Sequence, residues 1–197
     1  VCDRPCEPAC RRGRTHDKAV AICRLKRVAY DYKDDVDKYL PEIPVLKNGK
    51  KIALIGGGPA SITVARDLLP LGYDCTIFEK DHKPGGLMRT NIPSFRLPEE
   101  VLDEEIYRVI EMGASLKLNS YIDKIEPLIN DFDAVFVGTG APKGKDLNIE
   151  GRRTDKDSKN IHIGIDWLTS IAFEHTKKIG KKVIVIGGGN TAMDSCR

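Results

Sequence analysis

The stretch Lys51-Ile52-Ala53-Leu54-Ile55-Gly56-Gly57-Gly58-Pro59-Ala60-Ser61 decides the fold of this chain. Residues 52–55 form a continuous apolar run, which is typical of a buried parallel strand. Three glycines follow, and Pro59 stands where the first residue of a helix would stand. A glycine turn between a strand and a helix lets phosphates approach the backbone, and the helix N-terminus offers unpaired N–H groups and a positive dipole end. The stretch therefore predicts a dinucleotide pyrophosphate site.

Other residues are in register with this motif. Gly56, Gly58 and Ser61 occupy the three fingerprint positions, although Ser61 replaces the usual Gly or Ala where the helix packs closely on the sheet, so we expect some strain there. A second strand over residues 74–78 leads to Glu79, where a carboxylate would accept hydrogen bonds from a ribose. The motif does not distinguish FAD from NAD, and a glycine turn in another α/β fold is the alternative interpretation.

The same pattern occurs a second time. Lys182-Val183-Ile184-Val185-Ile186 runs into Gly187-Gly188-Gly189-Asn190-Thr191-Ala192. Gly187, Gly189 and Ala192 give the fingerprint, and Asn190 or Thr191 is suited to cap the following helix. Two such units predict two dinucleotides and hence electron transfer between them, whereas a merely structural buried strand and turn is the alternative for the second unit.

The order of elements predicts an α/β fold with a doubly wound parallel sheet. Strands are expected at 51–55, 74–78, 116–118, 133–137 and 182–186, and helices over 98–113 and 165–174. The chain divides into a Cys-rich helical segment (1–40), a linker (41–50), the first part of one dinucleotide domain (51–150), and a connection with the start of a second (151–197).

Composition narrows the class of protein. The chain has 197 residues and a net charge of +3 with both signs interspersed, which does not indicate a nucleic-acid partner. No apolar run approaches the roughly 20 residues of a membrane span, so we expect a soluble, cytoplasmic protein. The sequence begins without Met and stops inside the second unit, so we expect a truncated fragment of a longer chain.

Four of the six cysteines lie near the N-terminus, at Cys2, Cys6, Cys10 and Cys23. A disulfide set would need an oxidising compartment, and structural zinc prefers Cys-x2-Cys or Cys/His spacing. Iron–sulfur ligation by thiolates suits a chain that handles electrons, and we favour it. Cys75 and Cys196 are expected to be buried small residues.

The segment from Pro84 to Pro98 extends the first unit. Gly85-Gly86-Leu87 and Ile92-Pro93-Ser94-Phe95-Arg96-Leu97-Pro98 predict a loop that lies against a ligand, with Arg96 available to an anion or simply solvated. Here the chain resembles the family of the glutamate synthase small subunit, which includes the N-terminal flavin half of dihydropyrimidine dehydrogenase. The resemblance covers essentially the whole chain and extends to Gly138–Ala141 and Gly187–Asp194.

The resemblance implies that the first unit binds FAD and the second binds NAD(P)H. The residues implied for FAD lie around the first glycine turn and the loops after the strands: Gly56, Gly58, Pro59, Ala60, Ser61, Glu79, Lys80, Gly86, Leu87, Arg96, Ile122, Thr139 and Gly140. Those implied for NAD(P)H are Gly187, Gly189, Asn190, Thr191 and Ala192. NADH and NADPH are not separated, because the second strand of this unit is not in the sequence.

The resemblance also implies two 4Fe–4S clusters. Residues matching Cys2 and Cys6 bind one cluster, and the residue matching Cys10 joins upstream cysteines on the other. The fourth ligand of the first cluster is often Glu or Gln, but Lys26 stands at that position and an ammonium group cannot ligate iron. Cys23, one helical turn earlier, is proposed as the substitute.

The implied function is hydride transfer between nicotinamide and flavin, followed by single-electron steps through the clusters to a partner oxidoreductase or synthase subunit. No side chain is assigned as general acid, base or nucleophile, because the cofactors carry the chemistry. The alternative is a non-catalytic nucleotide-binding or structural subunit with a zinc-binding Cys module.

Overall fold

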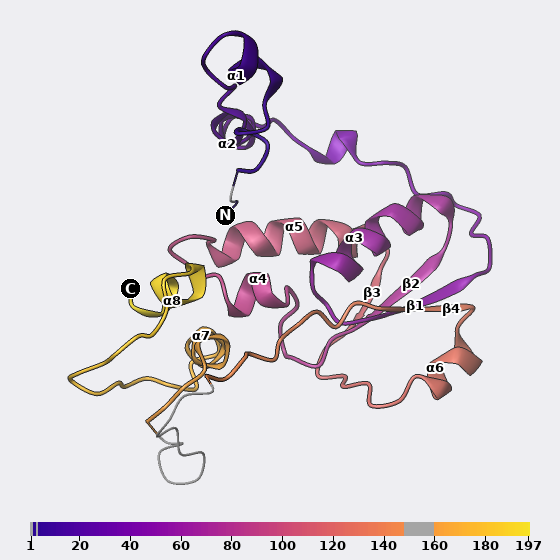
Figure 1. The fold of residues 1–197 in the computed structure, drawn as a ribbon. Coiled ribbons are helices and arrows are strands. Elements are labelled where there is room, and N and C mark those ends of the chain that lie inside the picture. The colour runs from indigo at the N-terminus through magenta and orange to yellow at the C-terminus, as the bar shows by residue number, and fades with distance from the viewer. Residues whose placement is uncertain (1, 3, 148–159) are drawn as a thin grey trace. The chain divides into compact units, whose positions relative to one another are not determined.

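The computed structural model describes residues 2, 4–147 and 160–197 (Figure 1). Within it the chain forms two compact units, Val1–Glu42 and Ile43–Arg197. The expected boundary between residues 150 and 151 lies outside the described residues. No helix in the described part of the chain combines the length and the apolar character that a membrane crossing requires.

The described residues of the N-terminal unit form three short helices. Its elements are α1 (Arg11–Thr15), α2 (Ile22–Asp31) and the 3-10 helix η1 (Asp37–Tyr39). The apolar spacing over residues 20–32 predicts a helix, and α2 agrees with it. None of these three helices buries a residue.

The second unit is built on a four-stranded parallel sheet with the order β3-β2-β1-β4. The strands are β1 (Lys51–Ile55), β2 (Asp74–Phe78), β3 (Ser115–Lys117) and β4 (Ala134–Val137). β1 lies at the centre, where Ala53 and Leu54 are completely buried. The expected α/β class and four of the five expected strands are therefore confirmed.

Helices cover both faces of this sheet (Figure 1). α3 (Pro59–Leu68) continues into the 3-10 helix η2 (Leu69–Leu71) and ends at Gly72, which has a left-handed φ of 85°. α3 packs on β1, β2 and α5 (Glu99–Glu111), whereas α6 (Glu126–Asp131) packs on β4. On the α6 side, the core consists of Ala53, Ile55, Phe78 and Leu128.

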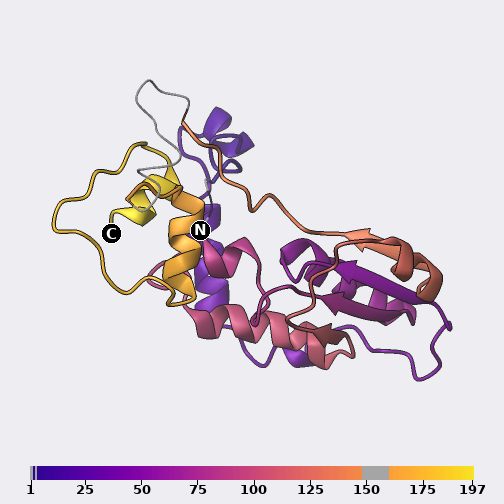
Figure 2. The same cartoon turned by 90° about the horizontal axis from the view of Figure 1, so that it is seen from below.

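The remaining helices are α4 (Leu87–Thr90), α7 (Gly164–Ala172) and α8 (Asn190–Ser195). α7 packs against both α4 and α8 (Figure 2). The helix expected over residues 165–174 is confirmed by α7. The strand expected over residues 182–186 is wrong: the segment is exposed, with Ile184 89% exposed, and is not part of the sheet. A buried parallel strand needs neighbours on both sides, and the described residues place none there.

Candidate functional site: a glycine cradle at the end of the sheet

The first glycine turn lies where β1 and β2 end side by side. The Gly56 amide donates to the Phe78 carbonyl at 2.8 Å, which continues the pairing of the two strands into the turn. Gly56 has a left-handed φ of 95°, and a Cβ atom there would come within 2.6 Å of the Gly138 carbonyl oxygen after β4. Only glycine fits this position, because both the backbone conformation and the space exclude a side chain.

Glu79 is buried against this turn, with 4% of its surface exposed. One carboxylate oxygen accepts from the Gly57 amide at 2.6 Å, and the other accepts from the Asp81 amide at 2.9 Å. Hydrogen bonds of this kind compensate a buried carboxylate. A carboxylate has about four acceptor positions, so these two bonds leave capacity for ribose hydroxyl groups.

A second glycine pair closes on the first. The Gly85 amide donates to the Gly57 carbonyl at 2.8 Å. A Cβ atom on Gly86, whose φ is 54°, would lie 2.9 Å from the Gly58 Cα atom. The backbones of the two turns are therefore in contact. Together they form a concave surface that stays open only because glycines carry no side chains. We call Gly56–Gly58 with Gly85 and Gly86 the glycine cradle.

Ser61 stands at the third fingerprint position, where glycine or alanine is usual. It is completely buried in the first turn of α3, and its hydroxyl has no hydrogen-bond partner. A Cβ atom on Gly138 would collide with the Ser61 Oγ atom, so the serine is accommodated by a glycine opposite. An orphaned buried hydroxyl beside the cradle fits a site that receives a polar group.

The other predicted residues of this unit lie around the cradle in different environments. Thr139 and Gly140 are exposed after β4, Lys80 is exposed after Glu79, and Leu87 is 37% exposed at the start of α4. Pro59 and Ala60 form the exposed first turn of α3, with Pro59 at the first helical position as expected. Ile122 instead packs partly buried on the core beneath the sheet.

Arg96 is neither a solvated charge nor a free anion ligand in this structure. Its guanidinium forms an ion pair with Asp194 of α8, whose side chain is 6% exposed. The pair joins the loop after α4 to the second glycine unit. The sequence contains no signal for this partner, because the two residues are 98 positions apart.

The second glycine unit keeps its turn and helix. Gly187 has a left-handed φ of 135°, and α8 begins at Asn190 with Gly189 as its N-cap. The expected capping by Asn190 or Thr191 is wrong, since the helix has no side-chain cap. Asn190 and Thr191 are exposed and Ala192 is half-buried.

Among the N-terminal cysteines, three thiols interact. Desolvation raises the pKa of the Cys23 thiol, and the nearby Cys2 and Cys6 thiols raise it further. The Cys23 amide donates to the Glu7 carboxylate at 3.0 Å, which ties α2 to the Cys2–Cys10 segment. Across residues 2, 4–147 and 160–197, however, no three Cys, His, Asp or Glu side chains are gathered closely enough to hold a metal ion.

Cys10 has a separate environment. Backbone N–H groups, first that of Val20 and then that of Arg12, lower the pKa of its thiol. All six cysteines are free. Cys75 is buried as expected, but Cys196 is exposed, which corrects the expectation for that residue, because it lies just after the last residue of α8.

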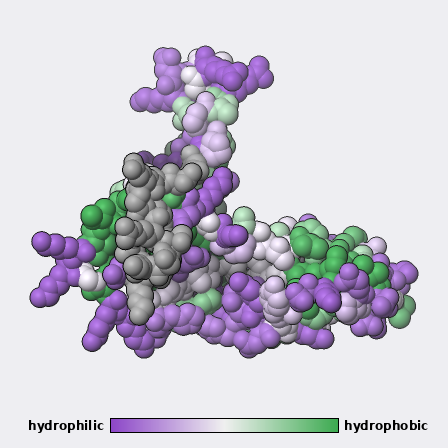
Figure 3. Space-filling model, turned by 60° about the horizontal axis from the view of Figure 1, so that its bottom comes forward, coloured by the Kyte–Doolittle hydropathy of each residue, from purple (hydrophilic) through white to green (hydrophobic). Residues whose placement is uncertain are grey.

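Two apolar features have no sequence signal. A cavity of about 730 Å³ lies among α4, the loop after it, α7 and α8, with Phe95, Trp167 and Ile171 among its lining residues. In Figure 3 hydrophobic side chains gather on the end of the molecule that carries α6 and β4, where Ile125, Ile129 and Val137 are exposed.

Comparison with known proteins identifies relatives along the whole chain. Residues 50–197 match the family described as pyridine nucleotide-disulphide oxidoreductase. The chain is 38% identical over 203 residues to the NADPH-Fe(3+) oxidoreductase subunit beta of Geobacter sulfurreducens, covering 100% of this chain and 30% of that protein. It is 36% identical over 207 residues to the glutamate synthase (NADPH) small chain of Bacillus subtilis, covering 98% of this chain and 41% of that protein.

The resemblance to the glutamate synthase small subunit is thus confirmed, although the chain spans less than half the length of either relative. A solved 2-naphthoyl-CoA reductase complex matches 86% of this chain and 24% of its own, with a TM-score of 0.61 and 24% identity. That likeness concerns the fold alone, and it agrees with the parallel sheet described above.

Proposed function

This chain belongs to the pyridine nucleotide-disulphide oxidoreductase family, and on that premise we propose that it is part of an FAD-dependent NAD(P)H oxidoreductase subunit. In this proposal the whole protein passes electrons between a nicotinamide cofactor, FAD and 4Fe–4S clusters, to or from a partner subunit that carries the final acceptor. The observation that carries the proposal is the Glu79 carboxylate, buried against the Gly57 amide where two parallel strands end.

The residues of the first unit fit the adenine-dinucleotide half of FAD. The glycine cradle leaves the backbone open to a pyrophosphate, and the first amides of α3 have no partner within the helix. Glu79 would accept from the adenosine ribose, and Ser61 offers a buried hydroxyl without a partner. Thr139 and Gly140 would close over the ribityl–pyrophosphate region. FAD, when bound, supplies the conversion between two-electron and one-electron chemistry.

The second unit is proposed to bind NAD(P)H. Gly187, Gly189 and Ala192 stand before and within the first turn of α8, where a helix N-terminus can receive a pyrophosphate. Asn190 and Thr191 are exposed beside them. The protein's task is to hold the two cofactors at fixed positions, and no described side chain is needed as a general acid or base.

The N-terminal cysteines are proposed to bind iron–sulfur clusters. Donor chemistry supports this, because thiolates are the ligands of such clusters and the Cys2 and Cys6 thiols lie near enough to Cys23 to raise the pKa of its thiol. Cys23 is the proposed replacement for a carboxylate or amide ligand at Lys26. Among the residues that the structure describes, the thiols are not gathered into a metal cage.

The flavin part is tested with the full-length protein. Under anaerobic conditions, NADH or NADPH should bleach the visible absorbance of bound flavin, and the more effective nucleotide identifies the donor. Glu79→Gln should weaken FAD binding by about ten-fold, the scale of one charged hydrogen bond. Glu111→Gln, at the exposed end of α5, is the matched control. A protein that holds flavin but is not bleached by either nucleotide would be a non-catalytic nucleotide-binding subunit.

The cluster part is tested by iron and acid-labile sulfide analysis with electron paramagnetic resonance of the reduced protein. Cys23→Ser should remove the signal of one cluster and leave the other. Cys196→Ser, at an exposed cysteine just after α8, should leave both unchanged. Zinc without iron would replace the cluster proposal by a zinc-binding Cys module.

A further inference from the structure

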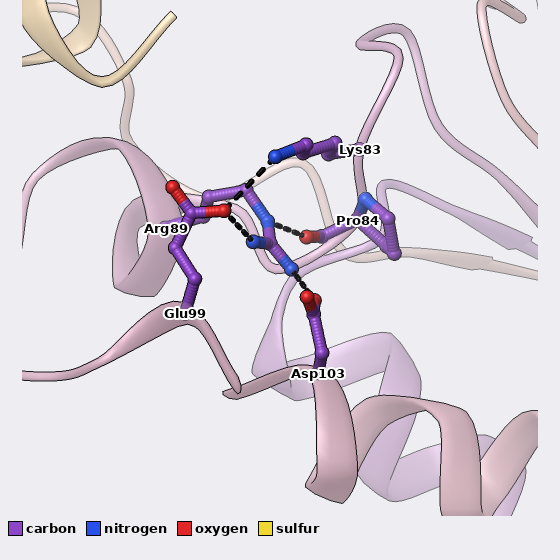
Figure 4. A network of polar contacts seen from close by, with 5 residues as sticks. All are labelled: Lys83, Pro84, Arg89, Glu99 and Asp103. Carbon is purple, nitrogen blue, oxygen red and sulfur yellow. Dashed lines mark hydrogen bonds and ion pairs between the residues drawn. The ribbon is translucent and has the colours of Figure 1, made fainter. Parts of the chain in front are cut away.

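A buried arginine lies directly behind the glycine cradle. The side chain of Arg89, in α4, is 3% exposed. Its Nε atom donates to the Pro84 carbonyl at 2.5 Å, and its Nη2 atom donates to Asp103 (Figure 4). Glu99 lies 3.5 Å from Nη1 and also accepts from Lys83 at 2.9 Å. We call Lys83, Arg89, Glu99 and Asp103 the Arg89 network.

The Arg89 network connects α5 to the Gly85–Gly86 turn. Glu99 and Asp103 are one turn apart on α5, so they present their carboxylates on the same face. Pro84, whose carbonyl Arg89 holds, is followed at once by Gly85, whose amide donates to Gly57. A Cβ atom on Gly85 would come within 3.1 Å of the Arg89 Cβ atom, so the turn packs directly on this side chain.

The burial of Arg89 costs free energy, and the contacts of its side chain indicate what this residue does for the fold. Burying a cation is expensive unless it is paired, and an apolar side chain in its place is often no less stabilising. Here the charge of the guanidinium is offset by two carboxylates, while its Nε atom fixes the direction of a backbone carbonyl. An apolar residue could fill the same space but would leave the Pro84 carbonyl free to turn.

We propose that Arg89 is a positioning residue that sets the Gly85–Gly86 turn against Gly57 and Gly58, and thereby sets the affinity and environment of the bound flavin. The inference rests on the proposed function in that the glycine cradle holds FAD. Arg89 touches no cofactor in this role; it acts through Pro84 and Gly85.

The test compares full-length wild type, Arg89→Gln and Arg89→Lys. Arg89→Gln should raise the FAD dissociation constant by about ten-fold or more, as expected for the loss of charged hydrogen bonds. At saturating FAD, the visible circular dichroism of its flavin should still differ from that of wild type. Arg89→Lys should recover part of the FAD affinity and part of the wild-type circular dichroism, because one ammonium donor can still reach the Pro84 carbonyl. Arg66→Gln, at an exposed pair on α3, is the matched control.

Each outcome decides something different. Wild type that binds no FAD would overturn the proposed function itself. Wild type that binds FAD while Arg89→Gln binds it equally well, or gives an unchanged flavin spectrum at saturation, would overturn the positioning role. If Arg89→Gln does not fold, Asp103→Asn replaces it, because this variant removes one partner of Arg89 at a side chain that is 39% exposed. Unchanged FAD affinity and flavin spectrum in Asp103→Asn would then refute the role.

Discussion

At the scale of single residues, the polar groups of the cradle differ in how well they are satisfied. Glu79 has a backbone N–H group on each carboxylate oxygen. Ser61, one helical turn away from the same glycines, has no partner for a completely buried hydroxyl. A buried unpaired hydroxyl costs about 1–3 kcal/mol. The unpaired hydroxyl of Ser61 therefore destabilises the ligand-free chain, and a substitution that deletes the hydroxyl should restore this free energy.

Ser61→Ala should raise the free energy of unfolding of the FAD-free chain by about 1 kcal/mol or more, since it deletes this hydroxyl. Chemical denaturation measures the change. Ser120→Ala is the matched control with the opposite expected sign, because the Ser120 hydroxyl donates to the Leu118 carbonyl at 3.0 Å. Destabilisation by Ser61→Ala would show that its hydroxyl is satisfied in solution.

Cys75 should be chemically silent in the folded chain. Burial, and then the charge of Asp74, raises the pKa of its thiol to about 11. At pH 8 the thiolate fraction is thus about one in a thousand, and the thiolate is the nucleophile. Alkylation followed by mass spectrometry should modify the exposed Cys196 in the native protein and Cys75 only after denaturation. Equal rates at the two positions would contradict the burial of β2.

At the scale of elements, the beginnings of β1 and β4 are tied by one carboxylate. Asp133, just before β4, accepts from the Lys50 ammonium and from the Lys51 amide, each at 2.8 Å. The hydrogen bond from Lys50, followed by that from Lys51, lowers the pKa of Asp133. Both side chains are more than one-third exposed, so solvent weakens the pair.

Asp133→Asn should therefore lower the thermal stability slightly, and only where Asp133 is ionised. A carboxyl group with a lowered pKa in the folded state stabilises fully above its unfolded pKa of about 3.9, and this stabilisation is lost as the pH falls through the folded pKa. The difference in melting temperature between wild type and variant should be largest at roughly pH 6 and should vanish as the pH falls through the lowered folded pKa of Asp133. Asp123→Asn, at an exposed position, is the control. A difference that persists at the lowest pH would refute the ion pair.

The elements also show which features the sequence can predict. β1, the glycine turn and the start of α3 follow from local signals: an apolar run, three successive glycines and Pro59 at the helix start. Residues 182–186 carry the same apolar signal, but they are not a strand, because a strand requires partners that periodicity does not report. α4 and α6 are too short to show a helical period.

The candidate site also contains some features that the sequence predicts and others that it does not. Glu79 and the glycines were predictable because spacing along the chain places them at one end of the sheet. The Arg89 network was not, because Arg89 and Asp103 meet only once α5 packs beside α4. The ion pair of Arg96 with Asp194 was not predictable either, because spacing along the chain does not indicate this partner.

At the scale of the whole chain, this ion pair connects the two proposed cofactor units. Arg96 lies in the loop that follows the Gly85–Gly86 turn and α4. Asp194 lies in α8, which follows the Gly187–Gly189 turn. Because Asp194 is almost completely buried, breaking the pair would leave a desolvated charge without its partner. In the proposed function, this connection would hold the proposed NAD(P)H unit at a fixed position relative to the proposed flavin unit.

Asp194→Asn should slow flavin reduction by NAD(P)H about ten-fold, or about 1.4 kcal/mol in the barrier, while FAD affinity changes by less than about two-fold. Stopped-flow absorbance and FAD titration measure the two quantities. The double exchange Arg96→Asp with Asp194→Arg should recover part of the rate. Asp67→Asn, at an exposed pair on α3, is the control. Loss of FAD affinity with an unchanged reduction rate would place the pair in flavin binding alone.

The central position of β1 has a consequence for how the chain is made. Ile52 pairs with Cys75 on one side and with Ala134 on the other, so one neighbour follows 23 residues later and the other follows 82 residues later. Synthesis proceeds at about 5–20 residues per second, so roughly 4–16 s separate the emergence of β1 from that of β4. During that interval the most buried strand of the finished sheet presents an open edge to other chains. Binding of a chaperone to nascent chains that end between β2 and β4 should be stronger than to chains that include β4.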